Sequence, residues 1–168
     1  MSHPPASLVT VSIGSNINRE YYIREAVSAL RERFGELKVS PVYETAAVGF
    51  DGEDFLNLVV SFETEIDVYQ VSALLKGIED KLGRDRSQPK FSARSIDLDL
   101  LTYADLILNE SGIQIPRDEI LENAFVLKPL SDLEADTDHP QLGINYQTLW
   151  DKMRAGAGRI EKFKMDLS

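Results

Sequence analysis

The sequence contains no cysteine and only two histidines, His3 and His139. The absence of cysteine excludes disulfide bonds, thiol nucleophiles and thiolate metal sites. Two histidines leave no histidine pair for zinc and little scope for histidine acid–base chemistry. No apolar run approaches the roughly 20 residues that a membrane-spanning helix needs, and the first residues lack the basic segment of a secretory signal. We therefore expect a cytoplasmic protein without a membrane partner.

The length and composition are those of one soluble domain. The chain has 168 residues, of which 43% are hydrophobic and 27% charged. Such a chain buries about two-thirds of its unfolded surface, which is enough for a hydrophobic core. Neither an internal repeat nor a linker is visible. We expect a single domain over residues 1–168, with residues 1–6 and about 155–168 as peripheral tails. We expect a monomer in preference to an obligate oligomer.

The charges are unevenly distributed. Eighteen Lys and Arg against 28 Asp and Glu give a net charge of −10, which disfavours binding to nucleic acids and to acidic membranes. One stretch has the opposite sign, with a single acid, Asp85, among five basic residues: Lys81, Arg84, Arg86, Lys90 and Arg94. Such a run is often only a solvated loop. The contrast of sign favours an anion-binding loop instead.

The hydrophobic pattern predicts an α+β fold. Period-2 and helical patterns alternate along the chain, and Asn18, Gly35 and Gly83 are helix-boundary signals. The expected strands are 8–13, 37–43, 55–63 and 96–103, the expected helices are about 19–34 and 68–82, and a hairpin at 106–115 and helices near 119–132 and 146–153 follow. The order β-α-β-β-α-β is that of a ferredoxin-like core, in which two helices pack on one face of a mostly antiparallel sheet.

Two acidic residues alternate with apolar ones in the last core strand. Positions two apart in a strand share a face, so Asp97 and Asp99 point to one side and Leu98 and Leu100 to the other. Their backbones are about 6–7 Å apart, which allows both carboxylates to reach a shared divalent cation or two cations. Oxygen ligands of this kind suit Mg²⁺. The alternative is the polar outer face of an edge strand.

The acidic strand directly follows the basic loop, and Arg94 lies three residues before Asp97. Cations beside carboxylates that hold magnesium are typical of phosphoryl-transfer sites. The sequence has no P-loop motif, and its turn Gly14-Ser15-Asn16 does not match G-x-G-x-x-G. Side chains and a loop would therefore have to hold a nucleotide.

The segment Lys90–Leu101, KFSARSIDLDLL, resembles the signature of the 6-hydroxymethyl-7,8-dihydropterin pyrophosphokinase family. The resemblance extends over about residues 8–153. Other matching segments are Ser12–Asn16, Tyr43–Thr45, Phe55–Asn57, Glu79 with Gly83-Arg84, Pro116, Phe125–Leu127 and Pro129-Leu130.

The resemblance implies an enzyme of folate synthesis that transfers pyrophosphate from ATP, its co-substrate, to the hydroxymethyl group of the pterin and releases AMP. It implies two Mg²⁺ ions at Asp97 and Asp99, which with Arg84 and Arg94 form the catalytic set. The implied pterin-binding residues are Thr45, Ala46, Val48, Phe55, Asn57 and Phe125. The implied ATP-binding residues are Glu79, Arg84, Arg86, Arg94, Leu100, Ile115 and Arg117. Without the resemblance, core packing would be the preferred role of both phenylalanines.

Some positions depart from the family pattern. Arg117 stands where many members have histidine, Asn123 where some have arginine, Ser92 where glycine or alanine is common, and Phe91 where some have tryptophan. These departures leave open a divergent paralogue that binds pterin or nucleotide without turnover. A ferredoxin-like interaction domain without a ligand is the third alternative. For the enzyme, residues 84–93 are expected to close over the site when Mg²⁺–ATP binds, together with the 45–53 loop.

Overall fold

The computed structural model describes residues 6–45, 54–83 and 96–167. The strands are β1 (Ser7–Ser15), β2 (Lys38–Val39), β3 (Val42–Thr45), β4 (Phe55–Thr64), β5 (Asp97–Tyr103), β6 (Leu108–Glu110), β7 (Ile113–Ile115) and β8 (Glu161–Phe163). The helices are α1 (Arg19–Phe34), α2 (Val68–Gly83), α3 (Glu119–Glu122), α4 (Ala124–Leu133) and α5 (Tyr146–Met153), with a short 3₁₀ turn, η1 (Arg154–Gly156).

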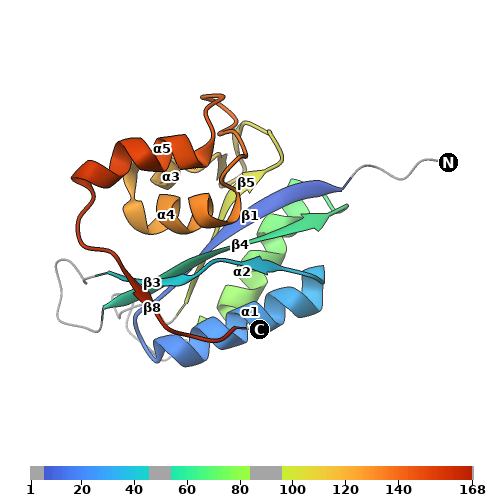
Figure 1. Ribbon diagram of the computed structural model, residues 1–168. Helices are drawn as coiled ribbons and strands as arrows, with labels where there is room; N and C mark the ends of the chain where they lie inside the picture. Colours follow the sequence, from blue (N-terminus) through green and yellow to red (C-terminus); the bar gives the residue numbers. More distant parts are fainter. Residues whose placement is uncertain (1–5, 46–53, 84–95, 168) are drawn as a thin grey trace.

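Among the described residues the main sheet has the strand order β5-β1-β4-β3-β8, with β2 also paired to β4. Every pairing in it is antiparallel. The part β5-β1-β4-β3 has the strand order of a ferredoxin-like core. The crossovers through α1 and α2 place β1 and β4 at its centre. The predicted fold class is confirmed (Figure 1).

Helices cover both faces of the sheet (Figure 1). On one face α1 and α2 bury a core that includes Val11, Ile13, Ile23, Leu58 and Leu75. On the other face α3, α4 and α5 pack against Val59 of β4 and Leu101 of β5. The prediction of α1 and α2 on one face is confirmed, and the later helices make a third layer.

Two local features differ from the expected elements. The strand expected at 37–43 is divided into β2 and β3 at Ser40-Pro41, because proline has no N–H for a strand ladder. Asn18 occupies the N-cap position of α1 with φ 41°, and its side chain makes no capping hydrogen bond. The predicted helix start is therefore correct, although the side chain of Asn18 does not cap the helix.

The C-terminal residues require a further correction. They were expected to be a peripheral tail from about residue 155, but Glu161–Phe163 forms β8 and pairs with β3 at the edge of the main sheet. The unpaired edge of β3 explains the difference, because its free N–H and C=O groups can accept another strand. Among the helices of the described part of the chain, none has the length and hydrophobicity needed to cross a membrane.

Candidate functional site

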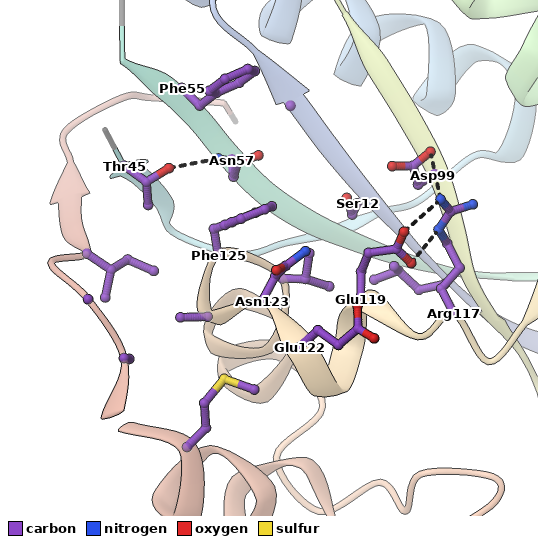
Figure 2. A pocket seen from close by; sticks show the side chains of 18 of the residues that line it. Ser12, Thr45, Phe55, Asn57, Asp99, Arg117, Glu119, Glu122, Asn123 and Phe125 are labelled. Carbon is purple, nitrogen blue, oxygen red and sulfur yellow. Dashed lines mark hydrogen bonds and ion pairs between the residues drawn. The ribbon is translucent and has the colours of Figure 1, made fainter. Parts of the chain in front are cut away.

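A cavity of about 780 Å³ lies on the sheet face that α3, α4 and α5 cover (Figure 2). Its floor is formed by side chains of β1, β3, β4 and β5, and its walls by α3, the start of α4 and the segment after α5. The described lining residues include seven of the predicted site residues: Thr45, Phe55, Asn57, Asp97, Asp99, Arg117 and Phe125. Segments from opposite ends of the sequence thus meet in one cavity.

The strand register places the floor residues in rows. Gly14 in β1 pairs with Asn57 in β4 on one side and with Asp97 in β5 on the other. Two residues earlier, Ser12 pairs with Asp99. Because residues directly opposite in neighbouring strands share a face, Asn57 and Asp97 flank Gly14 on the cavity floor. Because Gly14 has no side chain, the amide of Asn57 can lie over it, between β4 and the carboxylate of Asp97.

The Asn57 amide is nearly buried, with 8% of the residue exposed. Its Nδ2 donates to Oγ1 of Thr45 at 3.5 Å (Figure 2), which is at the weak end of hydrogen-bond distances. A Cβ added to Gly14 would lie only 2.8 Å from the Asn57 Oδ1 atom. The glycine is therefore needed for the amide to occupy this position. A buried amide with one long bond can form stronger hydrogen bonds to a bound molecule.

Two phenylalanine rings line the cavity near Asn57. Phe55 comes from the start of β4, and Phe125 from the first turn of α4 (Figure 2). Phe125 remains 37% exposed, so the core-packing alternative does not account for its position. A flat heterocycle next to the amide would have aromatic surfaces from two different elements available for stacking.

The acidic pair lies at the other side of the floor, on the edge strand β5. Asp97 and Asp99 are half-buried and line the cavity, whereas Leu98 and Leu100 are buried in the core on the opposite face. The predicted alternation is confirmed. The edge-strand alternative is correct about the position of β5 but misses the cavity above it.

The donor set of this pair fits Mg²⁺. Two carboxylates in a cavity are the typical protein share of a magnesium site, in which substrate phosphates and water complete the oxygen ligands. A group of three or more potential metal-ligating side chains is not present among residues 6–45, 54–83 and 96–167. The described residues alone therefore do not form a closed metal cage.

Arg117 connects this region with α3. Its backbone N–H donates to the Leu101 carbonyl at 3.0 Å, which fixes Arg117 next to β5. Its guanidinium donates to both carboxylate oxygens of Glu119, at 3.1 and 3.2 Å, and lies 4.0 Å from Oδ1 of Asp99 (Figure 2). Burial of Glu119 opposes its ionisation, but hydrogen bonds and the Arg117 charge prevail, so the pKa of Glu119 is lowered.

Residues 10–135, more than half of the chain, match the family described as 7,8-dihydro-6-hydroxymethylpterin-pyrophosphokinase. The chain belongs to this family. Two bacterial relatives carry the name 2-amino-4-hydroxy-6-hydroxymethyldihydropteridine pyrophosphokinase. The Bacillus subtilis protein is 33% identical over 131 residues, 76% of this chain and 78% of its own length. The Aquifex aeolicus protein is 31% identical over 134 residues, 79% of this chain and 83% of its own length.

Longer proteins also match this chain over part of their own length. The folic acid synthesis protein fol1 of Pneumocystis carinii is 35% identical over 148 residues, which are 86% of this chain but 20% of that protein. A crystal structure of a Plasmodium falciparum HPPK-DHPS triple mutant superposes with a TM-score of 0.71 at 14% identity, and covers 89% of this chain and 44% of its own. At that identity the superposition supports the fold alone. The resemblance found in the motifs is confirmed, and with it the class of the family, a pyrophosphokinase transferase of folate synthesis.

Three residues expected from the pyrophosphokinase resemblance to bind ATP do not line the cavity. Leu100 and Ile115 are buried in the core on the α1 and α2 face, and Glu79 lies on α2 itself. All three are thus on the opposite side of the sheet from the cavity floor. Their role in ATP binding stays a prediction.

Other predicted residues lie outside the described part of the chain. They are Ala46, Val48, Arg84, Arg86 and Arg94, together with the departing positions Phe91 and Ser92. The expected closure of residues 84–93 and of the 45–53 loop also falls largely on those segments.

Sequence reasoning missed part of the cavity wall. Glu119 and Glu122 of α3 and the segment Gly156–Ile160 line it without having been singled out. The glutamates belong to the short helix α3, whose sequence is typical of an ordinary charged surface helix. The C-terminal segment has no motif, and its position at the cavity depends on the pairing of β8 with β3.

Proposed function

We propose that this chain transfers pyrophosphate from ATP to 6-hydroxymethyl-7,8-dihydropterin, giving the pterin diphosphate and AMP. The observation that carries the proposal is the row Asn57–Gly14–Asp97 across three neighbouring strands. It places an amide suited to a heterocycle and a carboxylate suited to magnesium on one floor, separated by a residue without a side chain.

The pterin occupies the side of the cavity formed by β3 and β4. The Asn57 amide bonds the polar edge of the ring, and Thr45 lies next to it on β3. Phe55 and Phe125 provide aromatic surface for the ring faces. In this orientation the hydroxymethyl arm extends over Gly14 toward Asp97.

The ATP phosphates occupy the β5 side, where Asp97 and Asp99 would hold two Mg²⁺ ions. Bound magnesium supplies positive charge that offsets the charge of the triphosphate and orients it. Arg117, next to Asp99, adds a fixed cation at this position. The family resemblance implies further cations from Arg84, Arg86 and Arg94. It also implies ATP contacts of Glu79, Leu100 and Ile115, but these three lie on the other side of the sheet and do not line this cavity.

The reaction follows from this arrangement. The hydroxymethyl oxygen attacks the β-phosphorus of ATP in line, the bond from that phosphorus to the oxygen bridging to the α-phosphorus breaks, and AMP leaves. The hydroxyl proton passes to water. The chain binds the two substrates side by side, which replaces a bimolecular encounter by a reaction within one complex.

The same proposal covers the setting of the reaction. The chain acts as a single domain and as a monomer in the cytoplasm, on two small-molecule substrates. Its net charge of −10 is consistent with the absence of a nucleic-acid partner.

Calorimetry and product release together test the proposal. Titration with pterin in the presence of Mg²⁺ and a non-hydrolysable ATP analogue measures binding, and a parallel assay with ATP measures AMP. The enzyme binds both ligands and releases AMP in step with pterin consumption. Binding of both ligands without AMP would contradict turnover and identify a pterin-binding paralogue instead. Binding of neither ligand would favour the interaction domain.

A further inference from the structure

We propose that the C-terminal segment Gly156–Ile160 forms the end wall of the pterin side of the cavity, and that its small residues keep open the space that the pterin fills. The inference rests on the proposed function and adds to it a part of the chain with no counterpart among the predicted site residues. The segment follows α5 and precedes β8, and all five of its residues line the cavity.

The strand order determines which ligand the segment can reach. Because β8 pairs with β3, it lies at the opposite edge of the main sheet from β5. Three strand spacings separate β3 from β5, about 14 Å at the usual interstrand distance. The segment is therefore next to Thr45 on β3 and remote from the carboxylates of Asp97 and Asp99. A change in the segment should affect the pterin and spare the nucleotide.

The segment is held in place by interactions on both sides of its strand. In the ladder, Glu44 of β3 pairs with Glu161 of β8, and Val42 with Phe163. Arg19, at the start of α1, donates to the Glu44 carboxylate at 2.6 Å and to the Asp54 carbonyl at 2.8 Å. The Arg19 guanidinium carbon also lies 5.2 Å from the centre of the Phe163 ring, a distance at which cation–π attraction acts. The wall thus has a defined position next to Thr45.

The glycines of the segment are not required by the backbone or by packing. Neither Gly156 nor Gly158 has the positive φ that favours glycine, and an added Cβ would meet no atom within 4 Å at either position. The fold itself would accept side chains here. Arg159 is paired with Glu161 of β8 at 2.6 Å, so that the charge of its guanidinium is matched by a neighbouring carboxylate. What the small residues maintain is open volume at the pterin end.

Filling this volume tests the inference. Gly158→Trp introduces a large side chain, and Gly77→Trp is the matched control, because Gly77 is an exposed glycine of α2 on the other sheet face and also has no atom within 4 Å of an added Cβ. We expect Gly158→Trp to raise the Kd of the pterin at least about tenfold and to change the Kd of the ATP analogue less than about twofold. Gly77→Trp should change neither.

A second variant, Gly156→Leu, should raise the Kd of the pterin by a smaller factor if the wall limits pterin binding. Circular dichroism checks that each variant is folded. Unchanged pterin affinity in folded Gly158→Trp and Gly156→Leu would overturn the wall assignment. The proposed function would remain intact in that case, because the wild-type protein still binds the pterin. Equal losses for pterin and ATP analogue would also overturn it, since the effect would then not be confined to one side. Failure of the wild-type protein to bind pterin would instead contradict the proposed function, and the wall with it.

Discussion

Gly14 and Asn57 face each other across β1 and β4 so closely that a Cβ atom on Gly14 would lie 2.8 Å from Oδ1 of Asn57. Real Cβ atoms do not approach other atoms to this distance, so the two residues constrain each other. The glycine fixes where the amide can point, and the amide occupies the space that any other residue at position 14 would need.

Gly14→Ala should therefore displace the Asn57 side chain and weaken pterin binding. We expect the Kd of the pterin to rise about tenfold, since losing a well-placed hydrogen bond costs about 1–2 kcal/mol. The fold should survive, because a short side chain can move and overpacking of this size costs about 1–3 kcal/mol. Calorimetry with pterin and, separately, with the ATP analogue measures both effects, with Gly77→Ala as the control. Normal pterin affinity in Gly14→Ala would mean that the Asn57 amide does not bind the pterin.

Asp97→Ala and Asp99→Ala should each abolish turnover, because each removes an anionic ligand of magnesium. We expect kcat to fall at least about 10³-fold, or some 4 kcal/mol of transition-state stabilisation. Thermal stability should change little, since removing one of two neighbouring like charges relieves repulsion. The control is Asp105→Ala, an exposed acid just beyond the end of β5. Near-normal turnover of either variant at saturating Mg²⁺ would show that the metal assignment is wrong.

Arg117→Met should raise the KM for Mg²⁺–ATP and leave the pterin KM nearly unchanged. Arg117 is the cation nearest to Asp99 for which the structure gives an ion pair, so its loss removes positive charge where the phosphates are expected. An increase of about tenfold corresponds to about 1.4 kcal/mol. Steady-state kinetics measure it, with Arg24→Met on the exposed face of α1 as control. A lower KM for Mg²⁺–ATP would contradict this role and show that Arg117 mainly competes with magnesium for Asp99.

Acidification should destabilise the fold through His139. The residue is 1% exposed, and its Nδ1 accepts the backbone N–H groups of Gln141 and Leu142 at 3.2 and 3.3 Å. Burial lowers the pKa of His139 below its ordinary value of 6.5, because the charged form is poorly solvated there. The unfolded chain therefore binds the proton more readily, and stability that is fully present above pH 6.5 is lost as the pH falls below it.

The measurement is the melting temperature as a function of pH between 7.5 and about 5, a range above the ordinary pKa values of aspartate and glutamate, which are about 4. In the His139→Asn variant, the amide oxygen of the new side chain can accept hydrogen bonds but does not titrate. The melting temperature of this variant should therefore fall less over this pH range than that of the wild-type protein. Parallel curves for the two proteins would show that His139 does not carry the pH dependence.

The features that the sequence made predictable are those that depend on local periodicity. Alternation in a strand is sufficient to place Asp97 and Asp99 on one face and Leu98 and Leu100 on the other, and the structure agrees. The order of elements was likewise sufficient for the ferredoxin-like core, because short antiparallel connections leave few topologies.

The features that were missed depend on contacts between distant parts of the chain. The three residues of β8 are too few to show a period, and they form a strand only because β3 presents an unpaired edge. In the same way, the departure at Arg117 was visible, but its bond to Glu119 required the geometry of α3 beside β5. The ATP contacts expected of Leu100 and Ile115 came from the family resemblance and not from a local pattern. The structure buries both residues in the core on the α1 and α2 face, away from the cavity.

Product analysis tests the central claim most directly. The protein is incubated with Mg²⁺–ATP and 6-hydroxymethyl-7,8-dihydropterin, and the nucleotide and pterin products are quantified by phosphorus NMR and mass spectrometry. We expect AMP and pterin diphosphate in equal amounts, and neither product with Asp97→Ala. ADP with a pterin monophosphate would contradict transfer to the β-phosphorus, and the absence of any pterin-dependent nucleotide product would contradict the proposed enzyme.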